Sequence, residues 1–392
     1  MRIAMMTNNY LPYVGGVPIS VDRLARSLRG LEHDVDIFAP SYGQEGAEQG
    51  VIRCRSFKRK HDTFCTPNPL DRNIEDAFRK NSYDLIHVHH PMVAGYAALR
   101  MAKKHAIPLA FTYHTRYEQY LHHFGALGKM PGAQGIVTAH NRLFINKCDL
   151  VFAPTGSMRT YLEQVGINTP VEILPTGLAA EDFVVDRSIA ATIRNGLAYG
   201  RDRLYCTVSR LEKEKNVSFL IDAFAHYKQI CGHTFRLLVI GEGSERPALE
   251  RQAAQLGLED DILFTGNFPH SELSAWYGAC DAFVFASKSE TQGIVMLEAM
   301  AAGTPVFAVE ASGVNDLVQN AYNGYRIPDH PNAFAQVLSL LADMPCRLQA
   351  LEQGALQTAH AYSAKKIAQK ALANYESLLA QKEADKYAYN AI

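Results

Sequence analysis

Short apolar runs alternate with longer amphipathic segments along the whole chain. Each short run fits a buried strand and each longer segment fits a covering helix, so the pattern predicts an α/β fold with parallel sheets. The strands predicted in the first half are 2–6, 34–39, 85–89, 109–113, 150–153 and 171–174. Those predicted in the second half are 204–208, 236–240, 262–264, 282–286 and 306–309. Helices are predicted at 19–29 in the first half and at 219–227 and 246–255 in the second.

The alternation stops near 175–178 and starts again at 204. We therefore expect two α/β domains of similar size, joined by a hinge near 175–200. Helical periodicity returns over 364–382 and predicts a last helix that packs back onto the first domain. The expected domains are 1–176, together with a C-terminal helix at about 362–392, and 177–361.

Composition describes an ordinary globular protein. Of the 392 residues 47% are apolar and 20% charged, and a formal net charge of −1 gives no field that attracts nucleic acid. Seven scattered cysteines without a C-x-x-C motif favour free thiols in a reducing cytoplasm. The apolar start is too short for a signal peptide, and no stretch reaches the ~20 apolar residues of a membrane span. We expect a cytoplasmic protein, at most peripheral on the inner face of the membrane.

The segment 287–306 is the most informative part of the chain. Ser, Thr and Gly residues at 287–293 precede an apolar run at 294–302, which predicts a helix N-terminus suited to phosphate. Glu298 is the only charge in the run, and Glu290 lies ~12 Å from it along the axis if both are helical. That span is about the length of a sugar, a diphosphate and part of a ribose. The alternative is a capped core helix whose Glu298 pairs with a Lys or Arg.

Two further loops follow predicted strands, where ligands bind in parallel sheets. In the loop 209–216, Arg210 and Lys215 could neutralise a diphosphate, although a solvated charged loop is the alternative. The loop that begins at Gly241 starts like the dinucleotide fingerprint G-x-G-x-x-G, but Arg246 replaces the third glycine. This makes NAD binding a weak candidate and leaves a loop that lets backbone approach a nucleotide.

Gly15 and Gly16 follow the first strand and permit the same close approach, or form a simple turn. Histidines gather at 87, 89–90, 114 and 122–123, but their spacing does not fit a metal site. His114 stands at the carboxyl end of a strand, where it can donate to a substrate hydroxyl or carbonyl.

A basic run at 53–61, with Arg100, Lys103 and Lys104 downstream, could touch anionic lipid headgroups. The alternative is a solvated face, which the near-neutral net charge favours.

Taken together, the glycines at 15–16, the Arg210 and Lys215 loop and the pair Glu290 and Glu298 resemble the GT-B, family-4 retaining glycosyltransferases. The resemblance covers nearly the whole chain. It implies two Rossmann-like β/α/β domains facing a central cleft, with the C-terminal helix crossing back to the N-terminal domain. The N-terminal domain would bind the acceptor and the C-terminal domain the nucleotide sugar.

The resemblance also implies roles for residues. Arg210 and Lys215 would hold the donor diphosphate, Glu290 the sugar hydroxyls and Glu298 the ribose, with His114 near the reacting centre. No metal or cofactor would be required. The remaining donor-binding residues would be Gly15, Gly16, Gly241, Thr291, Gln292, Gly293, Ile294 and Val295. Acceptor contacts would come from Tyr113, Tyr117, Tyr120 and His122.

Within the family, 112–120 and 289–293 look most like the diacylglycerol glucosyltransferase branch, although a net charge of −1 departs from those basic enzymes. This implies transfer of a hexose, with UDP-glucose as the expected donor, to a lipid hydroxyl. The mechanism would be front-side substitution without a protein nucleophile, because the two carboxylates are too far apart for the ~5 Å of a retaining glycosidase. Alternatives are a soluble or polysaccharide acceptor, a nucleotide-sugar epimerase, or a binding module without catalysis. The sequence leaves the oligomeric state open.

Overall fold

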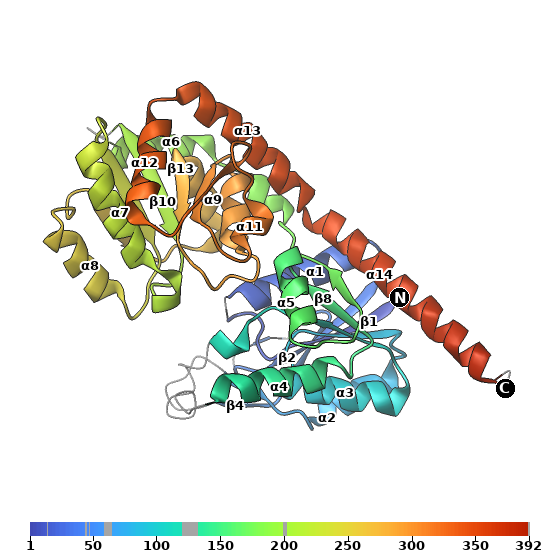
Figure 1. Cartoon of the computed structure of the whole chain (residues 1–392). Helices are drawn as coiled ribbons and strands as arrows, with labels where there is room; N and C mark the ends of the chain where they lie inside the picture. Colours follow the sequence, from blue (N-terminus) through green and yellow to red (C-terminus); the bar gives the residue numbers. More distant parts are fainter. Residues whose placement is uncertain are drawn as a thin grey trace. The chain divides into compact units, whose positions relative to one another are not determined.

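The computed structural model describes residues 1–13, 15–43, 45–46, 48–58, 65–119, 132–198 and 202–390 (Figure 1). The chain divides into two compact units. Unit 1 contains Met1–Gly177 and Ala364–Ile392, and unit 2 contains Leu178–Ser363. The first unit is therefore built from two separate stretches of sequence, with the second unit inserted between them.

Unit 1 is built on a seven-stranded sheet in the order β3-β2-β1-β6-β7-β8-β9, and every pair of neighbouring strands is parallel. Its strands are mostly buried and apolar, as in sheets that are covered by helices on both faces. They are β1 (Arg2–Met6), β2 (Asp34–Pro40), β3 (Val51–Cys54), β6 (Leu85–Val88), β7 (Leu109–Thr112), β8 (Leu150–Ala153) and β9 (Val171–Ile173). A short antiparallel pair, β4 (Ser56–Lys58) and β5 (Cys65–Pro67), accompanies the sheet.

The helices of unit 1 form between these strands, apart from the last one. They are α1 (Gly16–Arg29), α2 (Arg72–Lys80), α3 (Val93–His105), α4 (Ala133–Ile145), α5 (Gly156–Gln164) and α14 (Ala364–Asn390), with a short η1 (Tyr117–Gln119). The final helix α14 packs against α1 (Figure 1). Its apolar side chains belong to the same hydrophobic core as those of α1 and β1. Tyr375 of α14 also donates to or accepts from His87 Nδ1 at 2.7 Å.

Unit 2 carries a six-stranded parallel sheet in the order β12-β11-β10-β13-β14-β15. Its strands are β10 (Arg203–Val208), β11 (Phe235–Ile240), β12 (Ile262–Gly266), β13 (Ala282–Phe285), β14 (Val306–Val309) and β15 (Gly324–Ile327). Its helices are α6 (Arg187–Leu197), α7 (Val217–Ile230), α8 (Arg246–Gln255), α9 (His270–Gly278), α10 (Ile294–Ala301), α11 (Val314–Leu317), α12 (Pro331–Ala342) and α13 (Pro345–Ala361), with η4 (Ala180–Phe183) and η5 (Lys213–Lys215).

In each unit helices lie on both faces of the sheet, and one hydrophobic core fills each side. The α/β class and the parallel sheets expected from the apolar runs are confirmed. Four strands were not predicted, namely β3, β4, β5 and β15, which are three or four residues long and carry weak apolar patterns. Within the described residues, no helix is long and apolar enough to cross a membrane.

Candidate functional site

The loops after β10 and β13 bring Lys215 and Glu290 together in unit 2. Parallel strands end at the same edge of a sheet, and β10 and β13 are neighbours, so residues 75 positions apart meet there. Lys215 Nζ lies 2.5 Å from Glu290 Oε1, and their side chains are 13% and 19% exposed. A cation and a carboxylate that were expected to serve one ligand thus form a mostly buried ion pair.

A second donor holds the Glu290 carboxylate. Ser287 Oγ donates to Glu290 Oε1 at 3.0 Å. Burial by itself raises the pKa of Glu290, but the ion pair with Lys215 and the hydrogen bonds from Lys215 and Ser287 outweigh it, so the pKa lies below its usual value. An ionised carboxylate has about four lone-pair sites, which leaves acceptor capacity for hydroxyl groups of a ligand.

Arg210 lies in the same loop as Lys215, but its side chain is exposed. Its side chain is 57% exposed, and Nη2 lies 3.1 Å from Glu214 Oε1. The guanidinium is also close enough to contribute to the lowered pKa of Glu290. Because exposed ion pairs are worth only ~0–1 kcal/mol, Arg210 can exchange Glu214 for a phosphate at little cost.

Helix α10 begins where the sequence predicted, directly after Gly293. Gly293 has a φ of +78° and no side chain caps the helix. A Cβ at Gly293 would lie 2.4 Å from Met296 Cε, so glycine is required here on two counts. The first-turn N–H groups of Ile294 and Val295 have no partner within the helix, which makes this end an anion-binding position. Thr291 lies before it half-buried and Gln292 fully buried.

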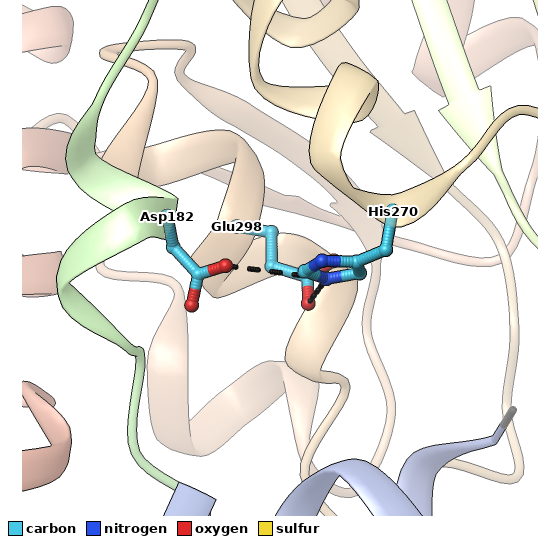
Figure 2. A group of neighbouring side chains, drawn as sticks. All are labelled: Asp182, His270 and Glu298. Atoms are coloured by element: carbon cyan, nitrogen blue, oxygen red, sulfur yellow. Dashed lines mark hydrogen bonds and ion pairs between the residues drawn. The ribbon is translucent and has the colours of Figure 1, made fainter. Parts of the chain in front are cut away.

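Glu290 is not part of α10, so the expected helical spacing to Glu298 does not apply. Glu298 lies inside α10, and its side chain is 7% exposed. Its partner is His270, whose Nε2 lies 2.9 Å from Glu298 Oε1, and not the Lys or Arg of the alternative interpretation (Figure 2). Asp182 Oδ1 lies 4.0 Å from the same nitrogen. Asp182, His270 and Glu298 each offer one ligand atom, and these atoms lie within 4.8 Å of one another. This spacing could hold a metal ion.

The glycine loop after β11 packs closely against the loop after β10. A Cβ at Gly241 would lie 1.9 Å from Ser209 O, and one at Gly243 would lie 2.3 Å from Leu211 O. The N–H of Gly241 donates to Gly266 O at 2.9 Å. These glycines therefore let the loop after β11 support the loop that carries Arg210 and Lys215.

In unit 1, Gly15 and Gly16 form the start of α1. Gly15 is the N-cap in an extended conformation, and a Cβ on Gly16 would meet nothing within 4 Å. The backbone at Gly16 is thus open to a ligand. No described residue would clash with a side chain at this position, so packing does not require glycine here.

The predicted histidine His114 is half-buried and joins a cluster with three buried histidines, His87, His89 and His90. His114 Nε2 lies 2.9 Å from His89 Nδ1, and the rings stack at 5.2 Å. His87 Nε2 lies 2.6 Å from Thr112 Oγ1, and His90 Nδ1 accepts the N–H of Asn8 at 3.2 Å. Burial lowers the pKa of His87, His90 and His114 to about 3, and that of His89 well below its usual value. The four imidazoles are therefore neutral at pH 7.

The predicted acceptor residues are only partly described. Tyr113 is 2% exposed, and its hydroxyl lies 3.3 Å from Glu118 Oε2. Glu118 also binds Arg116 and Tyr161, so Tyr113 belongs to a structural brace and offers no exposed hydroxyl to an acceptor. Tyr117 is half-buried, and burial raises its pKa. Tyr120 and His122 lie outside the described residues.

The basic side chains of the run at 53–61 and of Arg100 and Lys104 mostly pair with carboxylates of the protein itself. Arg53 is 14% exposed, pairs with Glu48 at 2.6 Å and donates to Leu11 O and Pro40 O. Arg55 pairs with Asp71 at 3.0 Å, and Arg100 and Lys104 both pair with Glu75. Residues 59–61 of the run lie outside the described residues.

Sequence reasoning missed three residues of these clusters: Ser287, Asp182 and His270. The need of the buried Glu298 for a partner was the one available signal. It could not identify His270, which stands 28 positions earlier and opens a different helix.

Comparison with known proteins follows the same two-part division. Residues 14–182 match the family described as Glycosyltransferase Family 4, and residues 189–357 match Glycosyl transferases group 1. The chain is 29% identical over 357 residues to an alpha-monoglucosyldiacylglycerol synthase of Streptococcus pneumoniae, covering 88% of this chain and 80% of that protein. It is 26% identical to the enzyme of the same name from Acholeplasma laidlawii, covering 83% and 84%.

Solved structures share the fold at lower identity. A sucrose-phosphate synthase from Thermosynechococcus elongatus superposes with a TM-score of 0.80 at 20% identity, covering 97% of this chain and all of that one. Anabaena HepE in complex with UDP-glucose superposes with a TM-score of 0.75 at 20% identity, covering 96% of this chain and all of that one.

Proposed function

Because the chain belongs to the GT-B glycosyltransferases of family 4, in the diacylglycerol glucosyltransferase branch, we propose that it moves a hexose from a nucleoside-diphosphate sugar to an acceptor hydroxyl with retention of configuration. The observation that carries the proposal is the Lys215–Glu290 ion pair beside the uncapped N-terminus of α10. Together these groups offer positive charge to a diphosphate and an ionised acceptor to sugar hydroxyls.

The leaving group is a diphosphate, on which negative charge develops as the glycosidic bond breaks. Arg210, Lys215 and the first-turn N–H groups of α10 would stabilise that charge, which lowers the barrier. When the donor binds, Lys215 would shift part of its bonding from Glu290 to phosphate, and Glu290 would accept sugar hydroxyls. His114, neutral at pH 7, would contact the sugar near the reacting carbon.

Retention would follow from substitution on one face of the sugar. The bond from the anomeric carbon to the diphosphate oxygen breaks, and the acceptor oxygen bonds to the same face. The acceptor proton passes to the departing diphosphate. No protein nucleophile is assigned in this scheme, because Glu290 is held by Lys215 and Ser287 as a hydrogen-bond acceptor.

We propose UDP-glucose as the donor and a diacylglycerol-type lipid as the acceptor. The two relatives are synthases of a glucosyl-diacylglycerol, and the HepE structure contains UDP-glucose. A lipid acceptor would bring the protein to an anionic membrane surface from the cytoplasmic side. A soluble or polysaccharide acceptor is the competing proposal for the same chemistry.

The test of transfer is a panel of nucleotide sugars, scored by nucleoside diphosphate release and by the anomeric configuration of the product. The variants are Lys215→Ala and Glu290→Gln, with Lys213→Ala as the matched control because Lys213 is exposed in the same short helix. We expect each site variant to lose about 10²–10³ in kcat, as for loss of one preorganised donor. Full activity of both site variants would reject the proposal, and release of an epimer without an acceptor would assign an epimerase.

The acceptor is tested by running the active donor with vesicles of diacylglycerol in neutral or anionic lipid. Product formation that rises with diacylglycerol supports the lipid acceptor. Transfer that is indifferent to lipid but rises with a soluble polyol rejects it. Equal partitioning onto neutral and anionic vesicles at every salt concentration would reject an electrostatic membrane contact. Unchanged turnover in EDTA is expected if the protein cations replace a metal.

A further inference from the structure

Two carboxylates from different elements of unit 2 converge on one imidazole nitrogen, that of His270. Glu298 comes from the middle of α10, His270 from the first position of α9, and Asp182 from η4 (Figure 2). His270 Nε2 lies 2.9 Å from Glu298 Oε1 and 4.0 Å from Asp182 Oδ1. Both carboxylates are buried, at 7% and 4% side-chain exposure, whereas the imidazole is 36% exposed.

The second carboxylate is itself fixed by the backbone. Asp182 Oδ2 accepts the N–H of Ala179 at 2.7 Å, at the turn that opens η4. Its other oxygen therefore faces the imidazole from a set position. The contact of 2.9 Å between His270 and Glu298 is an ordinary N–H···O hydrogen bond, which places the donated proton on Nε2.

We propose that His270 is a positioning residue that orients the Glu298 carboxylate toward the ribose hydroxyls of the donor, with Asp182 restraining the imidazole. The inference rests on the proposed function, which gives Glu298 the ribose. It adds that recognition of the ribose depends on a residue of another helix, and that this residue determines selectivity for a ribonucleotide over a deoxyribonucleotide.

The physical reason is the freedom of a carboxylate on a long side chain. A glutamate has three side-chain torsions, so a carboxylate that accepts two hydroxyls must first be ordered. A hydrogen bond to Oε1 orders the carboxylate, and an ionised carboxylate has about four lone-pair sites in all, so one such bond does not use up its capacity to accept. Burial keeps water away from the group, which strengthens its hydrogen bonds to a ligand.

The two carboxylates of this trio also affect the pKa of a neighbouring tyrosine, Tyr277. Its side chain is 1% exposed, and burial together with the charges of Glu298 and Asp182 raises its pKa. The tyrosine hydroxyl therefore stays protonated in the field of the two carboxylates.

The experiment measures the affinity of EDTA-treated protein for UDP, 2′-deoxy-UDP and 3′-deoxy-UDP by calorimetry. The variants are His270→Ala, His270→Gln, which keeps an N–H donor, and Glu298→Gln. Glu272→Gln is the matched control, since Glu272 is an exposed residue of the same helical turn. We expect the wild-type protein and the control to prefer UDP, and His270→Ala to lose about tenfold of that preference, as for a hydrogen bond to a charged group. His270→Gln should restore part of it.

Steady-state kinetics separate positioning from general damage. His270→Ala should raise the KM for the donor and leave kcat within about twofold, because the ribose is remote from the bond that breaks. A fall in kcat without a change in KM, or an unchanged UDP preference in His270→Ala when Glu298→Gln has lost it, would overturn the inference. An unchanged preference in Glu298→Gln, with transfer intact, would overturn the ribose assignment alone. Failure of the wild-type protein to bind any nucleotide would overturn the proposed function as well.

The same trio could instead hold a divalent cation. UDP binding that requires added Mn²⁺ or Zn²⁺ and loses this requirement in His270→Ala would overturn the positioning role. Equal UDP preference with and without the ion supports it.

Discussion

His114 Nε2 and His89 Nδ1 lie 2.9 Å apart, so one ring donates a hydrogen bond and the other accepts it. With both rings neutral, the tautomer of His89 determines which nitrogen of His114 carries a proton. The proposed sugar contact of His114 thus depends on a residue that is itself only 1% exposed.

Replacing His114 by Ala should lower kcat for transfer by about tenfold or more, because a hydrogen bond near the reacting carbon is lost. His226→Ala is the control, since His226 is exposed in unit 2. Rates at saturating donor would measure the effect. Equal rates for His114→Ala and the control would remove His114 from the proposed site.

The buried histidines predict acid sensitivity of folding. The pKa of His87 and of His90 is about 3 in the folded protein, against about 6.5 for an unfolded chain. Below about pH 6.5 the unfolded state binds protons that the folded state does not, so stability is full above that pH and falls toward pH 3. Each histidine should cost about 2 kcal/mol between pH 6.5 and pH 5. Denaturant titrations at several pH values would show this, and His87→Gln should flatten the slope. A slope that His87→Gln leaves unchanged would contradict the shift.

The Lys215–Glu290 pair predicts strong coupling in the free protein. Lys215→Met alone leaves a mostly buried carboxylate and should cost about 3 kcal/mol of unfolding free energy. Adding Glu290→Gln should recover part of that loss, because the isolated charge is gone. Urea unfolding of the four proteins measures the coupling. Additive single effects would mean that the two groups do not interact in solution.

Two glycines should respond oppositely to a methyl group. Gly241→Ala forces a Cβ to 1.9 Å from Ser209 O at a φ of +140°, so we expect a loss of about 3 kcal/mol or more. Gly16→Ala meets nothing within 4 Å and should leave stability unchanged or slightly raised. Thermal denaturation of both variants tests the pair. A stable Gly16→Ala protein with weakened donor binding would support a ligand at that backbone.

The sequence predicted the parts of the molecule that depend on local pattern. Buried strands, the start of α10 after Gly293 and the turn at 15–16 follow from periodicity and helix-end chemistry, and each is present. Partners across the fold could not be predicted in this way. The contacts of the His270 imidazole with Glu298 and of the Ser287 hydroxyl with Glu290 depend on which loops meet. So does the brace that buries Tyr113.

Gly241 is a second case in which the local sequence did not identify the partner. Its sequence context predicted close approach to a nucleotide, and the structure shows a close approach to the carbonyl of Ser209, which the sequence did not predict. A glycine motif identifies a place where backbone comes near something. The identity of the neighbour is a property of the folded chain.

The place of α14 in unit 1 has a consequence for biosynthesis. Residues that pack under β1 and α1, including Tyr375 on His87, are translated only after the whole of unit 2. At about 5–20 residues per second, the first unit waits on the order of ten seconds or more for the part of this core that α14 supplies. Unit 2 is continuous in sequence and can complete its core first. On the ribosome, the half that begins the chain is therefore the last to finish folding.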